Sequence, residues 1–334
     1  MANRKIKWGI AGLGNIAHRF AKDLSNHVDN GELYAVAARD QKRAEEFSRE
    51  YGSKKSYGSY QLLAEDSSVE AVYIATIHPF HRKLVELFLS NGKHVLVEKP
   101  AFTNSKDWDD MSQLAAANNV LLVEAMKAVA FPAYRELRRF IIENDLKINS
   151  IEAAFGNWHE FDSDWHLFNP KLSGGATLDV GVYGLWLYTD LCSAMGVEVP
   201  KPSLSFLRDN ETSQVDETVE FIFDGEVKGK IGASITRDLK REAIISGPDL
   251  EIKIHDKWWN PRTIDIKYAG LERQITTPSR GGGFEYETEH VCSLIIDNKQ
   301  QSDILCSSTS RKVIAIMETA LVEAGFEGLC HSDI

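Results

Sequence analysis

The chain has 334 residues, 43% of them hydrophobic and 26% charged, a balance typical of a globular protein with about two domains. Lys and Arg number 38 against 49 Asp and Glu, so the formal net charge is −11 and the mean surface field repels phosphate backbones and anionic lipid. This composition excludes collagen, coiled coil and wholesale disorder, and it argues against a nucleic-acid partner.

The sequence contains no segment that predicts export or membrane insertion. The apolar stretch after Arg4, Lys5 and Lys7 is interrupted by Gly12 and Gly14 and has no small-residue cleavage site behind it. No run of about 18 apolar residues exists, and the four cysteines are scattered without a C-x-x-C pair. We therefore expect a cytoplasmic protein with reduced thiols and no membrane partner.

The first 125 residues alternate short apolar runs with segments of helical periodicity. Strands are predicted at 7–12, 33–38, 71–76, 94–99 and 121–125, with helices at 15–26, 41–51, 80–91 and 105–118. Strand-helix alternation of this kind is typical of a doubly wound parallel sheet covered on both faces. We predict a Rossmann domain over residues 1–126.

After residue 127 several strand-length segments follow one another without regular helices between them. Strands are predicted at 150–158, 215–223, 227–235, 243–247, 250–254 and 263–268, with helices at 134–143, 178–195, 285–297 and 308–324. Short separators such as Asp224-Gly225 are typical of hairpin turns. We predict an α+β domain over residues 127–334 with a mostly antiparallel sheet, and a ligand cleft between the two domains.

The segment Gly12-Leu13-Gly14-Asn15-Ile16 directly follows the first strand and opens the first helix, the setting that a dinucleotide fingerprint requires. The first glycine permits the tight turn, and the second lets the backbone approach a pyrophosphate at the helix N-terminus. We therefore expect these five residues to bind a nicotinamide dinucleotide.

The end of the second strand distinguishes NADP from NAD, because an arginine there accommodates the 2′-phosphate and an acid binds the ribose hydroxyls. The chain has Arg39 followed by Asp40, with Arg43 one helical turn further on. Arg39 favours NADP, and Asp40 would then cap the following helix. The alternative is NAD, with Arg39 in a solvated loop and Asp40 on the ribose.

Polar residues also follow two other predicted strands, at the edge of the sheet where the cofactor crevice lies. We expect Thr76, His78, His81, Glu98 and Lys99 to reach the cofactor. His81 has an alternative role in capping the next helix or filling the seam between domains. A lysine beside nicotinamide can orient a substrate hydroxyl and lower the pKa of a neighbouring acid, so Lys99 is also a candidate catalytic residue, with a surface lysine as the alternative.

The segment Gly174-Gly175-Ala176-Thr177-Leu178-Asp179-Val180-Gly181-Val182-Tyr183 leads from glycines into a predicted helix. Asp179 and Tyr183 are four residues apart, which puts carboxylate and phenol on one helical face. They are either candidate catalytic residues or part of a capped core helix in which the phenol simply packs.

Three motifs together, GLGNIA at 12–17, EKP at 98–100 and SGGATLDVGVY at 173–183, resemble the Gfo/Idh/MocA oxidoreductase family. The runs VAARDQKRAEEF, YGSYQLLAED, GKHVLVEKP and LFNPKLSGGATLDVGVY are similar to its dimeric dihydrodiol dehydrogenase and NADP-xylose dehydrogenase branch. The resemblance spans both predicted domains. It implies a Rossmann domain followed by a domain whose large open sheet forms a homodimer or homotetramer interface.

The resemblance also implies roles for three residues. Lys99 falls on the lysine of the family's EKP motif, and Asp179 on the aspartate of its second-domain motif. Many members have histidine four residues later, whereas this chain has Tyr183, as does the branch in which tyrosine transfers the proton. The implied activity is an NADP-dependent hydride transfer between nicotinamide and a secondary alcohol or carbonyl of a sugar, polyol or cyclic trans-diol. In the oxidation direction we expect Lys99 and oxidised nicotinamide to lower the pKa of Tyr183 toward neutrality.

The chain departs from the animal diol dehydrogenases at Lys127 and Val129, where those proteins have Trp and Arg, so the resemblance does not define the substrate. The aromatic segment Trp158–His166 lies where substrate-facing loops are expected, and Trp165 and His166 are candidate substrate residues together with Tyr183. We expect no metal, because the His and Asp side chains of this segment are close together in an irregular loop, and such side chains rarely converge on one ion. A cofactor-binding sensor without chemistry, and the same chemistry with NAD, are the alternative functions.

Overall fold

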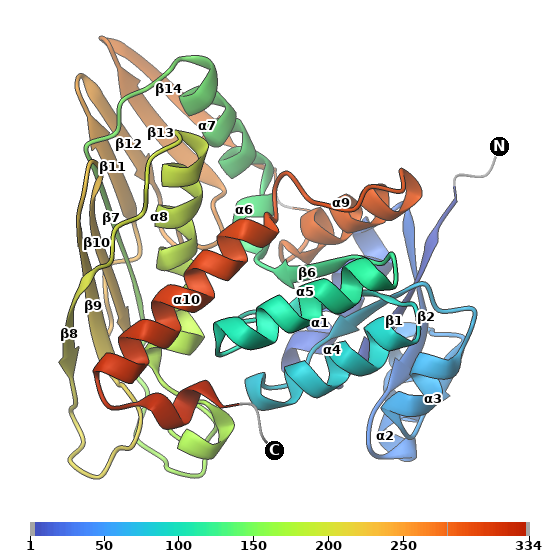
Figure 1. The fold of residues 1–334 in the computed structure, drawn as a ribbon. Helices are drawn as coiled ribbons and strands as arrows, with labels where there is room; N and C mark the ends of the chain where they lie inside the picture. Colours follow the sequence, from blue (N-terminus) through green and yellow to red (C-terminus); the bar gives the residue numbers. More distant parts are fainter. Residues whose placement is uncertain (1–3, 279, 332–334) are drawn as a thin grey trace.

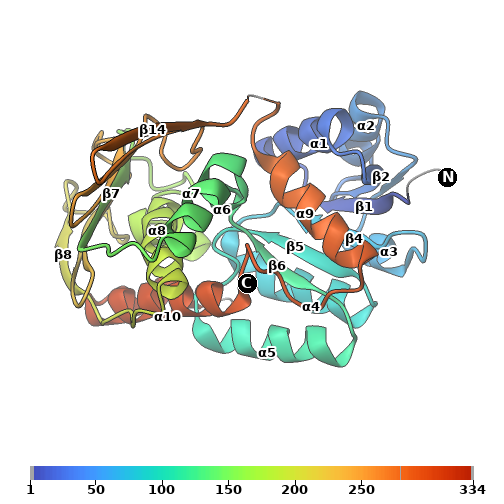
Figure 2. The same ribbon diagram turned by 90° about the horizontal axis from the view of Figure 1, so that it is seen from above.

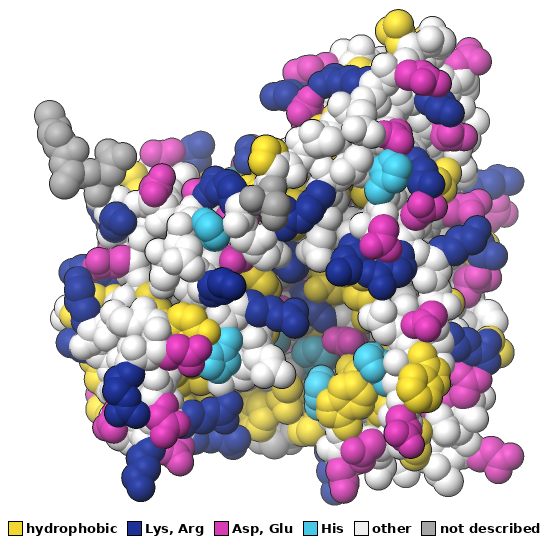
Figure 3. Space-filling view, turned by 180° about the vertical axis from the view of Figure 1, so that it is seen from behind, with side chains coloured by type: hydrophobic (Ala, Val, Ile, Leu, Met, Phe, Trp, Pro, Cys, Tyr) yellow, Lys and Arg dark blue, Asp and Glu magenta, His cyan; other side chains and the backbone are white. Residues whose placement is uncertain are grey.

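The computed structural model describes residues 4–278 and 280–331. Two sheets lie on opposite sides of the molecule, with helices packed between them (Figures 1 and 2). The cleft between them is visible in Figure 3 as a hollow whose surroundings carry basic, histidine and hydrophobic side chains.

The first sheet is parallel throughout, with strand order β3-β2-β1-β4-β5-β6. Its strands are β1 Ile6–Ala11, β2 Gly31–Ala37, β3 Lys55–Tyr57, β4 Ala71–Ile74, β5 His94–Glu98 and β6 Leu122–Ala125. The helices that connect them are α1 Asn15–His27, α2 Gln41–Tyr51, α3 Tyr60–Glu65, η1 His78–Phe80, α4 His81–Ser90 and α5 Ser105–Ala117. The prediction of a doubly wound Rossmann sheet is confirmed, and the strand order reverses between β1 and β4, where such sheets bind ligands.

Local sequence explains where several of these helices begin. Asp40 accepts hydrogen bonds from the backbone N–H groups of Lys42 and Arg43, and Asn104 accepts one from Asp107 at the start of α5. Such side chains satisfy backbone donors that have no partner within the helix. α2 and α5 begin at the predicted residues, and α1 and α4, which have no such cap, begin within one residue of the predicted positions.

The second sheet has eight strands in the order β14-β13-β12-β11-β7-β10-β9-β8, and its strand pairs are antiparallel except β7 with β10. The strands are β7 Ser150–Gly156, β8 Ser203–Leu207, β9 Thr218–Asp224, β10 Lys228–Ser234, β11 Ala243–Gly247, β12 Leu250–Ile254, β13 Thr263–Tyr268 and β14 Leu271–Thr276. The remaining helical elements are α6 Lys127–Ala130, α7 Pro132–Glu143, η2 Pro170–Leu172, η3 Thr177–Gly181, α8 Val182–Ala194, α9 Phe284–Ile296, α10 Ser307–Glu323 and η4 Glu327–Cys330. The predicted mostly antiparallel sheet is confirmed.

Helices cover only one face of this sheet. α7 and α8 pack against its strands and α10 packs on α8, whereas the outer face has no helix over it (Figure 1). Alternating burial in β9 and β10 follows from this arrangement, because one side of each strand contacts the core and the other faces outward.

Helix α9 lies against the first sheet, beside α1, although it comes late in the sequence (Figure 2). The indole N–H of Trp8 in β1 donates a hydrogen bond to Cys292 Sγ at 3.1 Å, and Phe20 in α1 packs edge-on against Phe284 at the start of α9. The chain thus returns to the Rossmann sheet after building the second one. The division at residues 126 and 127 stays a prediction.

Candidate active site

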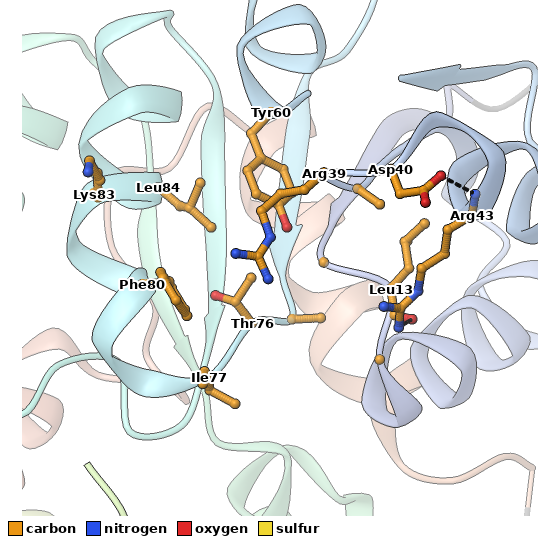
Figure 4. A pocket seen from close by; sticks show the side chains of 14 residues that line it. Leu13, Arg39, Asp40, Arg43, Tyr60, Thr76, Ile77, Phe80, Lys83 and Leu84 are labelled. Carbon is orange, nitrogen blue, oxygen red and sulfur yellow. Dashed lines mark hydrogen bonds between the residues drawn. The ribbon is translucent and has the colours of Figure 1, made fainter. Parts of the chain in front are cut away.

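A cavity of about 530 Å³ opens at the carboxyl edge of the first sheet, where β1, β2 and β4 end (Figure 4). Its lining is Gly12, Leu13, Gly14, Ala38, Arg39, Asp40, Arg43, Tyr60, Ala75, Thr76, Ile77, Phe80, Lys83 and Leu84. Five of the predicted cofactor residues, Gly12, Leu13, Gly14, Arg39 and Thr76, therefore lie around one cavity.

The glycine turn at this cavity leaves backbone accessible. Gly12 has a φ of +90°, and a Cβ at this position would stand 2.8 Å from Thr76 Cγ2, so both conformation and space require glycine. A Cβ on Gly14 would meet nothing within 4 Å, and no side chain caps the N-terminus of α1. Open space beside an uncapped helix N-terminus fits a dinucleotide pyrophosphate.

Cationic side chains lie at several places around the cavity. Arg39 extends between Tyr60 and Thr76 in Figure 4, with its guanidinium 5.7 Å from the Phe80 ring centroid. Arg43 donates a hydrogen bond to the Leu13 carbonyl at 2.6 Å, and Lys83 lines the opposite side. The residues here fit a phosphate-bearing ligand.

Asp40 lines the same cavity, but its carboxylate caps α2. It accepts from the N–H groups of Lys42 at 2.8 Å and Arg43 at 3.2 Å. Asp40 thus caps the helix, as expected if Arg39 selects NADP.

A second cavity, of about 200 Å³, lies between the two sheets. Its lining comes from both of them: Ile16, Arg19, Glu98, Lys99, Ala125, Lys127, Phe155, Asp179, Val180, Tyr183, Trp259, Asn260 and Phe284. The structure thus brings together the three candidate catalytic residues Lys99, Asp179 and Tyr183 with Ile16 and Glu98.

Lys99 and Asp179 form an ion pair across this cavity. The Lys99 ammonium donates to the backbone carbonyl of Asp179 at 2.5 Å and to its carboxylate at 3.0 Å. Burial opposes charge on both groups, but each one's charge stabilises the other, so the pKa of Lys99 lies above and that of Asp179 below its ordinary value. Both residues are charged at neutral pH.

Asp179 lies in a π-helical turn, η3, that precedes α8. The prediction placed Asp179 and Tyr183 on one face of a regular α-helix. The wider turn changes the spacing but still directs both residues to the cavity. Single π turns inside helices are frequent at functional sites.

Tyr183 faces the same cavity beside Lys99. The Lys99 ammonium is 5.2 Å from the centroid of its ring, and the Phe155 ring lies 5.4 Å away on the other side. No described residue forms a hydrogen bond with the Tyr183 hydroxyl, which leaves it available to a ligand. Burial raises the pKa of Tyr183 to about 12 although the Lys99 charge lowers it, so the phenol is neutral at pH 7 in the chain alone.

Glu98 contacts the backbone of Lys99. One carboxylate oxygen accepts from the Tyr73 hydroxyl, and the other accepts from the Lys99 backbone N–H at 3.1 Å. Burial raises the pKa of Glu98 above its ordinary value. Its hydrogen bonds fit a role in positioning β5 and Lys99.

The two predicted cofactor histidines lie outside both cavities. His78 donates through Nδ1 to the Ser173 carbonyl at 3.1 Å, which ties η1 to the second domain, and burial lowers its pKa to about 3. His81 is fully buried, with Nδ1 near the carbonyls of Pro100 and Ala101 and Nε2 near that of Thr76. All three carbonyls lie within residues 1–126, so His81 joins the segments that follow β4 and β5.

Three other predicted site residues also lie outside the cavities. Asn15 begins α1 and is exposed. Trp165 packs against His159 and Phe168, and His166 is exposed next to it. His166 is close enough to Asp179 for that charge to raise its pKa, although burial lowers the pKa overall.

Sequence reasoning missed much of the cavity lining. Tyr60, Phe80 and Lys83 come from segments with no fingerprint. Trp259 stacks on Phe155 with ring centroids 3.6 Å apart and also faces the 200 Å³ cavity. Only the pairing of distant strands brings these residues to the site.

Comparisons with known proteins place the chain in a family. Residues 6–126 match the family described as "Oxidoreductase family, NAD-binding Rossmann fold". Trans-1,2-dihydrobenzene-1,2-diol dehydrogenase of Xenopus tropicalis is 32% identical over 332 residues, covering 96% of this chain and 98% of the relative. The chain belongs to the Gfo/Idh/MocA oxidoreductase family. The prediction of an enzyme, a dehydrogenase or reductase, is thereby confirmed.

Solved structures of this fold extend over both domains. An aldose-aldose oxidoreductase from Caulobacter crescentus, complexed with glycerol, superposes with a TM-score of 0.84 at 18% identity, covering 96% of this chain and 98% of that one. A 3-ketoreductase from Actinomadura kijaniata, in complex with NADP and TDP-benzene, gives 0.79 at 20% identity, with 96% and 98% covered. The whole chain therefore has the two-domain fold of these Gfo/Idh/MocA-like enzymes.

Metal-ligand clusters and membrane-spanning helices are both absent from the described part of the chain. Residues 4–278 and 280–331 contain no group of three or more His, Cys, Asp or Glu side chains arranged to hold a metal ion. Within the same ranges, no helix combines the length and hydropathy needed to cross a membrane.

Proposed function

We propose that this protein is an NADP-dependent oxidoreductase that transfers a hydride between nicotinamide and a secondary alcohol or carbonyl of a sugar, polyol or cyclic trans-diol. The observation that carries the proposal is the contact of Lys99 with Asp179 beside the unpartnered Tyr183 hydroxyl. The Lys99 ammonium and the Tyr183 phenol face one cavity. These are groups that can transfer a proton to or from a substrate oxygen.

The cofactor preference rests on the charges at the 530 Å³ cavity. Arg39, Arg43 and Lys83 face it with one acid, Asp40, whose carboxylate caps α2. A 2′-phosphate would be held by Arg39 and Arg43, whereas NAD would leave both cations without an anion. The glycine turn and the start of α1 would hold the pyrophosphate.

When bound, the nicotinamide supplies or accepts the hydride. In reduction, Tyr183 donates its hydroxyl proton to the substrate carbonyl oxygen. Its pKa of about 12 keeps the phenol protonated at neutral pH, which suits a proton donor. Lys99 stabilises the phenolate that remains, because its ammonium is held charged by Asp179.

In oxidation, Tyr183 must first lose its proton in order to accept one from the alcohol. In the chain alone, burial outweighs the charge of Lys99 and the pKa of Tyr183 stays at about 12. The expected fall toward neutrality also involves the charge of oxidised nicotinamide and stays a prediction. Oxidation at neutral pH therefore depends on added positive charge from the oxidised cofactor, and we propose reduction as the direction that the protein's own charges favour.

The walls of the 200 Å³ cavity suit a ring-shaped substrate. Phe155, Trp259 and Phe284 present aromatic surfaces to it, and such surfaces bind the apolar faces of sugars and cyclic diols. Trp165 and His166 remain proposed substrate residues, although neither lines this cavity. A relative at 32% identity is named for a dihydrobenzene diol, in agreement with this substrate class.

We also propose that the protein forms a homodimer or homotetramer through its second sheet. No helix of the described residues covers the outer face of this sheet, which carries an open groove of about 820 Å³ across β7 to β11. Ion pairs such as Lys230 with Glu220 lie along the face. Sedimentation of the protein, with Lys230→Glu compared with wild type, tests this assembly.

The test of function begins with purified protein. NADPH and NADH binding is measured by fluorescence, and turnover is followed with pentoses, hexoses, inositols and cyclic diols and their carbonyl forms. Lys99→Met and Tyr183→Phe should lower turnover at least about a hundredfold while preserving NADPH binding. Wild-type turnover in both variants refutes the assignment. Tight NADPH binding with no absorbance change across the panel favours a sensor.

A further inference from the structure

Two cationic side chains at the 200 Å³ cavity have no assigned role. Arg19 comes from α1 and Lys127 from α6, and both line the cavity together with Lys99 and Tyr183. Lys99 is paired with Asp179. Among the described residues, neither Arg19 nor Lys127 has a carboxylate oxygen within 4.0 Å, so neither cation is part of an ion pair, although Glu98 also lines the cavity.

Lys127 is held in place by uncharged groups. Its ammonium donates to the Gly282 carbonyl at 3.0 Å and lies 4.4 Å from the ring centroid of Phe284. These contacts direct the cation toward the cavity. They leave it without an anionic partner at hydrogen-bond distance.

The two cations are also close enough to repel each other. Burial lowers the pKa of Lys127, the negative charges of Glu287, Glu98 and Asp23 raise it without forming an ion pair, and the Arg19 charge adds a smaller lowering. Two like charges facing one cavity raise the free energy of the empty site, and a bound anion relieves that cost.

We propose that Arg19 and Lys127 bind a carboxylate of the substrate, which makes the preferred substrate a sugar acid rather than a neutral sugar or diol. This inference rests on the proposed function and narrows its substrate class. It also gives a physical meaning to Lys127, the position where the chain departs from the animal diol dehydrogenases. The aromatic walls at Trp259 and Phe155 would contact the ring of such a substrate.

A structural role for Lys127 makes different predictions. Glu287 in α9 is fully buried, and neither of its carboxylate oxygens has a hydrogen-bond partner among the described residues. The Lys127 charge lowers the pKa of Glu287, so Lys127 also compensates the charge of a buried acid. If that is its function, Lys127→Met lowers the unfolding midpoint and reduces turnover of acidic and neutral substrates equally.

The experiment compares matched ligands that differ in one carboxylate. D-glucuronate is paired with D-glucose, and D-gluconate with D-glucitol, while glucose 6-phosphate tests phosphate as the anionic group. Binding to the NADPH-bound protein is measured by thermal shift and by nicotinamide fluorescence, and turnover is measured separately. The variants are Lys127→Met, Lys127→Arg and Arg19→Met. Lys22→Met is the control, because it removes the same charge from an exposed position of α1 outside both cavities.

The expected result is that the acids bind wild type at least about tenfold more tightly than their neutral partners, the usual scale for a charged hydrogen bond. Lys127→Met and Arg19→Met should reduce this ratio about tenfold, while Lys127→Arg retains most of it and Lys22→Met leaves it unchanged. The affinity for NADPH should change by less than about twofold in all four variants.

Several outcomes overturn the inference. The proposal is wrong if no acid binds more tightly than its neutral partner, or if both members weaken equally in Lys127→Met. A tenfold loss of NADPH affinity with an unchanged preference for acids would mean that the two cations bind the cofactor instead of the substrate. Tighter binding of glucose 6-phosphate than of the carboxylates would mean that the anionic group of the substrate is a phosphate. Selective acid binding with no turnover of any ligand would contradict the proposed function but leave the anion site intact.

Discussion

Lys99 at the end of β5 and Asp179 in η3 are joined by two hydrogen bonds, one to the backbone carbonyl at 2.5 Å and one to the carboxylate at 3.0 Å. This contact links the first sheet to the helix that carries Tyr183. Because the backbone carbonyl takes part, Lys99 is held even where the side chain of Asp179 moves. The carboxylate adds the charge that keeps the ammonium protonated.

The first prediction concerns this carboxylate. Asp179→Asn keeps the shape of the side chain but removes the negative charge, so the pKa of Lys99 falls and the ammonium is less firmly placed beside Tyr183. We expect kcat to fall about 10- to 100-fold with NADPH affinity unchanged within about twofold. Steady-state kinetics and cofactor titration measure both. Asp224→Asn, at an exposed strand end, is the control, and an equal kcat in the two variants would contradict the role.

The second prediction concerns cofactor choice. Arg39→Ala should weaken NADPH binding at least about tenfold, since a charged hydrogen bond to the 2′-phosphate is lost, and should leave NADH binding nearly unchanged. Fluorescence titration with both cofactors measures this. The control is Arg49→Ala, at an exposed position of α2 outside the cavity. Unchanged NADPH affinity in Arg39→Ala would mean that Arg39 does not bind the 2′-phosphate, and would favour the alternative in which Asp40 binds the ribose of NAD.

Arg43→Ala should behave differently from Arg39→Ala. Arg43 also donates to the Leu13 carbonyl in the glycine turn, so its loss should loosen the pyrophosphate site as well. We expect weaker binding of both cofactors, with the larger loss for NADPH. Weakening of NADPH alone would show that the contact with Leu13 has no part in cofactor binding.

The third prediction concerns pH. With a pKa of about 12 in the chain alone, Tyr183 stays protonated across the neutral range, so kcat for reduction should be flat from about pH 6 to 9 as far as this group is concerned. Oxidation needs the deprotonated phenol, so its kcat should rise with pH over the same range. Initial rates in both directions measure this. A reduction rate that falls tenfold across that range would show that Tyr183 ionises near neutrality.

The fourth prediction concerns the buried carboxyl that supports η3. Asp216 accepts a hydrogen bond from the Thr177 backbone N–H at 2.7 Å, and burial raises its pKa from 3.8 to about 7. A pKa raised in the folded state means that the folded protein retains the proton longer than the unfolded chain. The stabilising contribution is therefore complete below about pH 4 and is lost as pH rises through about 7.

Asp216→Asn mimics the protonated acid at every pH. Relative to wild type, the variant should gain stability between about pH 4 and 7, by roughly 4 kcal/mol at most. Urea unfolding at pH 4.5 and 7.5 measures the difference. Asp224→Asn, whose carboxylate is exposed, should show no such change. An identical pH dependence in Asp216→Asn and wild type would mean that Asp216 is ionised in the folded protein.

Local sequence signals predicted most of the central elements. The strands of the first sheet are buried on both faces, so continuous apolar runs mark them. In the second sheet, β11, β12 and β13 match their predicted ranges residue by residue. The elements that were missed have weaker signals. β8 and β14 are edge strands, and only one residue of β14 is buried, while β3 has three residues.

The sequence by itself determined the dinucleotide turn, the family and the identity of Lys99, Asp179 and Tyr183 as candidates, because each depends on a short contiguous motif. Only the tertiary structure decided which residues share a cavity. Arg19, Lys127 and Trp259 come from α1, α6 and the segment after β12, and no local pattern records their proximity. Charge balance is likewise a tertiary property, since burial and the distance between charged groups set the pKa of Tyr183 and leave Arg19 and Lys127 without an ion-pair partner among the described residues.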